Sequence, residues 1–184
     1  MKIRLLVISV LVASLALVPG VAASPVAAQQ RAQNVELVGQ IGGVVYAIAV
    51  QGDYAYIGVG PRLVILNIAD PAQPVIVGQT GILPGVVWDV AVTGSYAYIA
   101  AGYSGLCIIN ISNPAAPSQA CDCVTPWFAW FTYGVAVAGS YAYVAEGGRG
   151  LHIFNVSDPA APSETGFYDT PGYAQDVAVA GSYA

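Results

Sequence analysis

The chain repeats itself at a nearly constant spacing, and this periodicity restricts its possible folds more than any other feature. A Gly-Ser-Tyr-Ala-Tyr motif begins at Gly94 and Gly139, a close variant begins at Gly52, and the first four residues of the motif begin at Gly181. These glycines are 42, 45 and 42 residues apart. A second apolar motif keeps the same phase, at residues 63–71, 106–114 and 151–159. Two motifs in phase predict repeated structural units, each packed against its neighbours.

Each unit contains four short extended segments separated by turns. In the second unit, Trp88–Val92 turns at Gly94-Ser95 into Tyr96–Ala100, and a glycine-rich turn then leads into Leu106–Ile111. Asn113-Pro114 and Pro117 precede a fourth segment near residues 119–123. Tyr, Val and Ile at period two, bounded by Gly, Pro and Asn, are strand and hairpin signals. Four strands in about 43 residues is the size of one β-propeller blade. A β-solenoid is the alternative, but its coils are shorter.

The repeats resemble the LVIVD repeat family of bacterial and archaeal surface proteins. The residues that carry this resemblance are the Gly-Ser-Tyr-Ala-Tyr turn, the strand at residues 63–68 and the Asp-Pro turns at Asp70 and Asp158. The resemblance covers residues 35–184 and implies a propeller-like fold outside the cytoplasm, with no defined reaction. The sequence departs from the family pattern at Asn67, Asn110 and Asn155, where an acid is usual, and at Gly134, where Asp89 and Asp176 stand in other repeats.

We therefore expect an all-β fold, a β-propeller built of four-stranded antiparallel blades, with three complete blades and partial units. The expected layout of residues 35–184 is a closing strand at 35–43, repeats at 44–85, 86–131 and 132–172, and the start of a fourth repeat at 173–184. Propellers have four to eight blades. We thus expect an incomplete ring, and this chain to be a truncated piece of a longer protein.

The first residues have the pattern of a secretory signal peptide. Lys2 and Arg4 precede an apolar run at residues 5–18, and small residues allow cleavage after Ala23 or Ala28. A membrane anchor is the alternative, but a helix of that length spans only ~21 Å of a ~30 Å hydrocarbon layer. We predict a signal peptide at residues 1–23, a linker at residues 24–34 and no membrane insertion after cleavage. The mature protein is then extracellular, at the cell surface or periplasmic.

Charge is scarce and negative. After cleavage, three arginines and no lysine remain against ten acidic residues, a net charge of −7. Such a chain does not attract nucleic acid or anionic lipid. Only 8% of the residues are charged and 57% are hydrophobic. This composition excludes intrinsic disorder and coiled coils.

Catalytic and metal-binding patterns are not found in this sequence. His152 is the single histidine, and it replaces Val64 and Cys107 of the other repeats. Apolar residues at matched positions favour a structural place over a general base. The Asp-Pro turns lack the clustered oxygen ligands that calcium requires. We predict no enzymatic activity, no cofactor and no metal site.

The three cysteines allow two interpretations. Cys107 lies in the third segment of the second repeat, and Cys121 and Cys123 lie in its fourth. Adjacent strands are about 4.8 Å apart, so a cross-strand disulfide from Cys107 to either of them can form if the register fits. The third cysteine would then remain a free thiol. Three small buried cysteines are the alternative.

An aromatic segment between the second and third repeats is the candidate binding site. It lies at residues 127–133, and its connection is three residues longer than those of the other repeats. Exposed rings at a blade connection bind sugars or partner proteins, whereas buried rings pack between blades. The candidate ligand-binding residues are Trp127, Phe128, Trp130, Phe131, Tyr133, Asp89 and Asp176.

These observations predict a secreted or cell-surface binding module for an unknown protein or glycan. The alternative is part of an exported enzyme, or an enzyme accessory domain, whose catalytic residues lie in C-terminal sequence that this chain lacks. A third interpretation is a structural spacer. Exposed rings at residues 127–133 favour binding, and neither the ligand nor the number of blades follows from the sequence.

Overall fold

The structure, a computed structural model, describes residues 45–124 and 130–184, which all belong to the compact unit Val38–Ala184. The predicted signal peptide, linker and closing strand at 35–43 lie outside the described residues. The described part of the chain contains strands and turns and no helix, so no helix there could cross a membrane.

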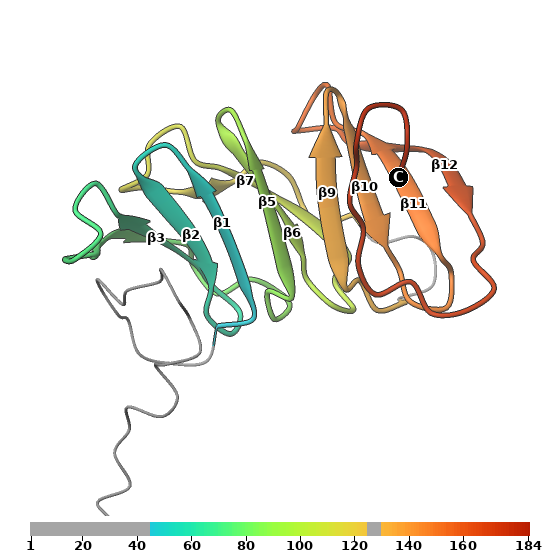
Figure 1. Cartoon of the computed structure of the whole chain (residues 1–184), viewed down its shortest axis with the longest axis horizontal. Coiled ribbons are helices and arrows are strands. Elements are labelled where there is room, and N and C mark those ends of the chain that lie inside the picture. Colours follow the sequence, from blue (N-terminus) through green and yellow to red (C-terminus); the bar gives the residue numbers. More distant parts are fainter. Residues whose placement is uncertain (1–44, 125–129) are drawn as a thin grey trace, which may run out of the picture. The chain divides into compact units, whose positions relative to one another are not determined.

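Three antiparallel sheets follow one another along the chain, each with four strands in sequence order (Figure 1). The first sheet contains β1 (Ala47–Gln51), β2 (Tyr54–Gly58), β3 (Leu63–Asn67) and β4 (Val75–Gln79). The second contains β5 (Asp89–Thr93), β6 (Tyr96–Ala100), β7 (Leu106–Asn110) and β8 (Ser118–Gln119). The third contains β9 (Gly134–Ala138), β10 (Tyr141–Ala145), β11 (Leu151–Asn155) and β12 (Ser163–Tyr168). The prediction of four-stranded antiparallel blades is confirmed.

Turn residues explain why the repeats share one geometry. The turn between the first two strands of each sheet contains a glycine in the left-handed region, with φ of 58°, 57° and 58° at Gly52, Gly94 and Gly139. Glycine reaches this region without a steric penalty. An asparagine ends the third strand of each sheet, and its Oδ1 accepts the N–H two residues on at 2.9 Å: Asn67, Asn110 and Asn155. The asparagine side chain therefore closes the same turn in each of the three repeats.

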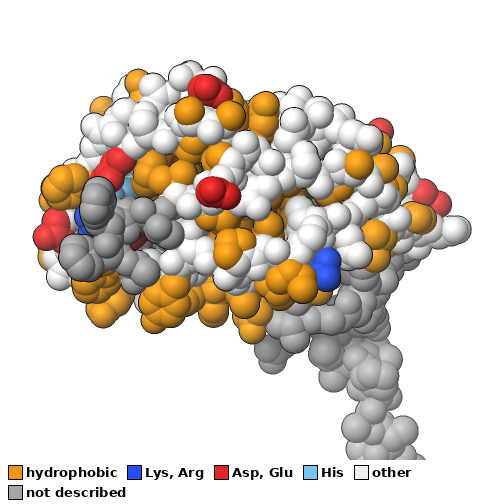
Figure 2. Space-filling model, turned by 180° about the vertical axis from the view of Figure 1, so that it is seen from behind, with side chains coloured by type: hydrophobic (Ala, Val, Ile, Leu, Met, Phe, Trp, Pro, Cys, Tyr) orange, Lys and Arg blue, Asp and Glu red, His pale blue; other side chains and the backbone are white. Residues whose placement is uncertain are grey.

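Apolar side chains fill the space between neighbouring sheets. Leu63 and Ile65 of β3 pack with Ile99 and Ile109 of the second sheet in one cluster. On the other face of that sheet, a second cluster joins side chains of the second and third sheets: Tyr98, Leu106, Ile108, Val135, Val144 and Phe154. Strand β7 is therefore apolar on both faces. The surface seen in Figure 2 is largely uncharged, with a few scattered acidic and basic groups.

The outermost strands are irregular. The pairing of β3 with β4 shifts register between Ile65 and Leu66, and that of β11 with β12 shifts between Ile153 and Phe154. In the second sheet, the expected strand near residues 119–123 is replaced by the two-residue β8. The chain rejoins β7 only at Val124, which pairs with Leu106. This connection has more residues than the strand opposite it, so the extra residues bulge out.

Candidate functional site

An aromatic residue directly precedes the first strand of each sheet. These residues are Tyr46, Trp88 and Tyr133, before β1, β5 and β9. The rings of Tyr46 and Trp88 are stacked with centroids 5.1 Å apart, and Trp88 and Tyr133 meet edge to face at 6.3 Å. A row of rings therefore runs across the same end of three neighbouring sheets. Sequence reasoning identified Tyr133 but missed Tyr46 and Trp88, although their shared repeat position is visible in the sequence.

Next to this row lies a pocket of about 370 Å³. Among the described residues, its walls are five aromatic side chains and two glycines: Tyr103, Trp130, Phe131, Tyr133, Tyr173, Gly147 and Gly148. Three of these, Trp130, Phe131 and Tyr133, are candidates from the sequence, whereas Tyr103 and Tyr173 were missed. The candidates Trp127 and Phe128 lie outside the described residues.

Phe131 is the centre of the ring packing. Its centroid lies 5.0 Å from Trp88, 4.9 Å from Tyr103 and 4.5 Å from Tyr133. The backbone on its C-terminal side is fixed by the Thr132 N–H, which donates to Gly102 O at 3.0 Å. The pairs of Phe131 with Trp88 and Tyr103 are edge to face, and such pairs add about 0.5–1.5 kcal/mol each to the free energy gained by burial. Phe131 and Tyr133 therefore pack against neighbouring rings and also line the pocket.

Two glycines let the rings approach the turn between β10 and β11. A Cβ on Gly148 would lie 2.9 Å from Trp130 Cζ3, too close for the ring to stay in place. A Cβ on Gly147 would lie 3.2 Å from Tyr133 and 3.4 Å from Tyr173. The N–H of Ala174 donates to Gly147 O at 2.9 Å and so fixes the backbone beside Tyr173. The pocket thus depends on two positions without side chains.

The described walls of the pocket are partly exposed to solvent and carry no charged side chain. Tyr103, Trp130 and Tyr173 expose 67%, 43% and 69% of their surface. The polar side-chain groups of the described lining are the tyrosine hydroxyls and the Trp130 indole N–H. The pocket therefore presents ring faces and edges to any ligand.

The two candidate aspartates do not line the pocket. The Val90 N–H donates to Asp89 Oδ1, and the Val135 N–H of the next sheet donates to Asp89 Oδ2, both at 2.8 Å. Burial raises the pKa of Asp89, and these two hydrogen bonds act in the opposite direction. Asp176 is exposed and accepts the Val177 N–H at 2.7 Å. Asp89 therefore connects two sheets, which is a structural role.

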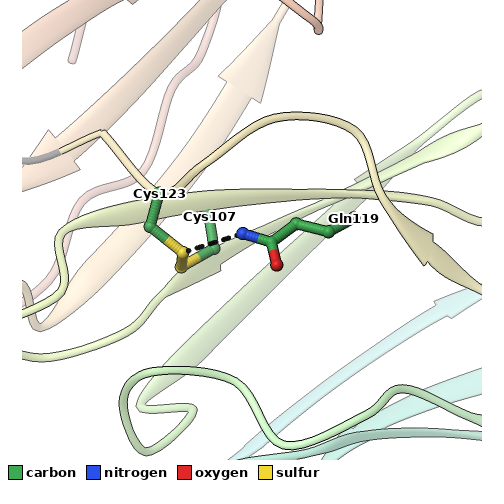
Figure 3. Close-up of a disulfide and its surroundings, with 3 residues drawn as sticks. All are labelled: Cys107, Gln119 and Cys123. Atoms are coloured by element: carbon green, nitrogen blue, oxygen red, sulfur yellow. Dashed lines mark hydrogen bonds between the residues drawn. A yellow bond between two sulfur atoms is a disulfide. The ribbon is translucent and has the colours of Figure 1, made fainter.

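The structure pairs Cys107 with Cys123 in a disulfide (Figure 3). It joins β7 to the bulged connection after β8, and Gln119 Nε2 lies 3.5 Å from Cys123 Sγ. Cys121 remains free and half-buried. Burial raises the pKa of its thiol, and Asp122 and Asp158 raise it further. A thiol with a raised pKa is a poor nucleophile and a poor metal ligand.

The third sheet contains a cluster of ionisable residues around the buried His152, for which the sequence predicted a structural place, but sequence reasoning missed its partners. His152 and Glu146 are 0% and 1% exposed, with His152 Nε2 3.8 Å from Glu146 Oε2. On the other side of the ring, His152 Nδ1 lies 2.8 Å from Glu164 Oε1. Arg149 Nη1 lies 3.7 Å from Glu146 Oε2. A comparison of the repeats could have identified these acidic residues, because they replace apolar ones. Ala101 of the second repeat stands at the position of Glu146, and Ile76 of the first stands at that of Glu164.

This group is only partly satisfied. Both Glu146 oxygens and His152 Nε2 are buried without a hydrogen-bond partner. Burial raises the pKa of Glu146, whereas His152 and Arg149 lower it. Within residues 45–124 and 130–184, no three His, Cys, Asp or Glu side chains gather as a metal site would require. The ring of His152 is fully buried, whereas Glu164 and Arg149 are partly exposed.

Comparison with known proteins places the repeats in a family. Four consecutive segments match the family model described as LVIVD repeat: residues 42–80, 84–125, 132–170 and 171–184. The resemblance seen in the sequence is thereby confirmed. No curated protein matches the chain.

Two solved structures have a similar fold. The computationally designed Ika4 protein matches with a TM-score of 0.58 and 11% identity, over 78% of this chain and 83% of that one. The computationally designed Ika8 protein matches with a TM-score of 0.60 and 7% identity, over 74% of this chain and 40% of that one. At such identities the likeness shows the fold alone.

Proposed function

Because the chain belongs to the LVIVD repeat family, we propose that it is a non-catalytic propeller-type module that binds a protein or carbohydrate partner outside the cytoplasm. The observation that carries this proposal is the open pocket whose described walls are five aromatic side chains and two glycines. Exposed aromatic clusters are rare on proteins without a partner, and rings dominate the energetics of many interfaces.

The structure of the pocket supports binding more than packing alone. Phe131 contacts rings on several sides and acts as a support. Tyr103 and Tyr173 remain two-thirds exposed, and Trp130 remains partly exposed. A side chain that served only to fill the space between sheets would be buried as Phe154 is. The outer rings are therefore available to a ligand, and the inner ring holds them in place.

Two features support a place outside the cytoplasm. The N-terminal residues have the pattern of a signal peptide. The Cys107–Cys123 disulfide is typical of proteins that fold in an oxidising compartment. N-terminal sequencing of the protein from the culture medium or cell envelope tests this part. We expect a new N-terminus after Ala23 or Ala28, and an intact Met1 on protein found only in the cytoplasm would contradict it.

Binding is tested with glycan and peptide arrays and a pair of matched variants. Trp130→Ala combined with Tyr173→Ala removes two exposed walls of the pocket. Tyr168→Ala is the control, since Tyr168 is 65% exposed, close to the 69% of Tyr173, and does not line the pocket. We expect the double variant to lose array binding and the control to retain it. Equal binding by both variants, or no binding by the unmodified protein, would contradict the proposal.

A further inference from the structure

The chemistry of the pocket walls restricts its ligand further than the general proposal does. In the described lining, no carboxylate, carboxamide or basic side chain is present. A sugar ring carries several hydroxyl groups, and each hydroxyl that is buried without a partner costs about 1–3 kcal/mol. The tyrosine hydroxyls and one indole N–H are few partners for such a ring. A ligand without hydrogen-bonding groups suits these walls better.

The rings that line the pocket face in different directions. The ring planes of Tyr103 and Phe131 are inclined by 84°, and those of Phe131 and Tyr133 by 41°. These rings pack on one another, and with Trp130 and Tyr173 they line one pocket, so a compact group inside it would meet rings from more than one side. A single flat ring face, by contrast, is the usual platform for a sugar or a nucleobase. The pocket geometry therefore favours a rounded group.

Charge determines which rounded group fits. Each aromatic face carries a partial negative charge and attracts cations. The one arginine near this turn, Arg149, lies 3.7 Å from Glu146 and does not line the pocket. The mature chain has no lysine and three arginines against ten acidic residues. No cation of the described lining therefore competes for the ring faces, and the overall charge favours a positively charged ligand.

We propose that the pocket recognises a quaternary ammonium group, such as the trimethylammonium head of choline or of trimethylated lysine. This proposal rests on the proposed binding function and names the group that is bound. A trimethylammonium group has no N–H to satisfy, a rounded apolar surface and a full positive charge, so it matches all three properties of the walls. The pocket volume of about 370 Å³ leaves room for the chain that carries the group.

The test compares choline with its neutral isostere. Choline chloride and 3,3-dimethylbutanol, in which carbon replaces the charged nitrogen, are titrated into the full chain by calorimetry. We expect choline to bind about tenfold more tightly than the isostere, because the attraction of a cation to ring faces is lost with the charge. Trp130→Ala should weaken choline binding about tenfold, and the control Tyr168→Ala should leave it unchanged.

Further ligands show which kind of molecule presents the quaternary ammonium group. They also distinguish a failure of this inference from a failure of the proposed binding function. A trimethyl-lysine peptide and phosphocholine-bearing vesicles, each beside its unmethylated counterpart, show whether a protein or a lipid presents it. Equal affinity for choline and its isostere would overturn the inference, as would undetectable choline binding. If array sugars or unmethylated peptides bind while choline does not, the binding function stands and only the inference fails. If nothing binds, both fail.

Discussion

The second and third repeats connect their third strand to the outer segment at the same position but by different chemistry. In the second repeat, Cys107 of β7 forms a disulfide with Cys123. In the third, His152 stands at the equivalent position of β11, and its Nδ1 lies 2.8 Å from Glu164 on β12. One connection is a covalent bond that depends on the redox state, and the other is a contact between an imidazole nitrogen and a carboxyl group.

The first repeat shows that neither connection is required for a blade to form. Its equivalent residue is Val64, which is 6% exposed and packs in an apolar cluster. The strand order and the pairing of β2 with β3 are the same as in the other sheets. The backbone ladder and the turn residues therefore define the blade, and the residue at this position varies its stability.

Loss of the disulfide should have the largest effect on this comparison. The two cysteines are 16 residues apart, and closing a loop of that length stabilises a protein by about 3 kcal/mol. Replacing Cys107 by valine, as in the first repeat, together with Cys123→Ser should lower the free energy of unfolding by that amount. Urea unfolding measures it. Cys121→Ser is the control, and an equal loss there would show that the disulfide is not the cause.

Replacing His152 by valine should cost less, about 2 kcal/mol, within the range for the loss of a hydrogen bond to a charged group, here Glu164. Glu146 then loses its neighbour at 3.8 Å, whereas Glu164 can turn to solvent. Adding Glu146→Ala, the residue of the second repeat, should restore most of the stability, because it removes a buried carboxyl group that has no hydrogen-bond partner. A double variant less stable than His152→Val in urea unfolding would contradict this explanation.

Asp89 tests whether the two repeats are stabilised independently. Its carboxylate accepts the Val135 N–H across the boundary between the second and third sheets. Asp89→Ala should lower the free energy of unfolding by about 1.5 kcal/mol, since a hydrogen bond to a charged group is lost. The exposed Asp176 is the matched control, and Asp176→Ala should change the stability by less than about 0.5 kcal/mol. Equal effects of the two substitutions would show that the contact between sheets contributes nothing.

The smallest effect should be on the pH dependence. Burial raises the pKa of Glu146 above its ordinary value of 4.5, with His152 and Arg149 opposing and Glu164 reinforcing the shift. Between the ordinary and the raised pKa the folded state binds more protons than the unfolded state, so stability falls as the pH rises through this window. Glu146→Gln should remove that decrease in unfolding measurements between pH 4 and 7. An unchanged pH profile would show that Glu146 does not titrate differently in the folded state.

The blades could be predicted from the sequence because their signals are local. Gly52 and Gly94 mark tight turns, and the alternating residues beside them mark strands, so no knowledge of distant contacts is needed. The packing between sheets is not local. The stacking of Tyr46 on Trp88 depends on how two blades lie side by side, and it is absent from the pattern within one repeat.

The missed site residues have similar explanations. Glu146 stands in a glycine-rich turn, where an acid is normally solvated, yet its side chain is 1% exposed. Tyr173 joins the pocket only because Ala174 pairs with Gly147. Cys107 pairs with Cys123 and not with Cys121 because of the path by which the irregular chain after β8 returns to β7. Strand spacing alone does not determine that path.

The irregular outer strands have a consequence for how copies of this chain behave in a concentrated solution. Regular, unpaired strand edges recruit edges of other chains and lead to aggregation. Here the register shifts beside β4 and β12 interrupt two of the outer edges, and β8 offers only two residues. The net negative charge makes copies of the chain repel one another over long distances, but it does not block a free strand edge. At close range, the irregular outer strands are the feature that disfavours edge-to-edge pairing.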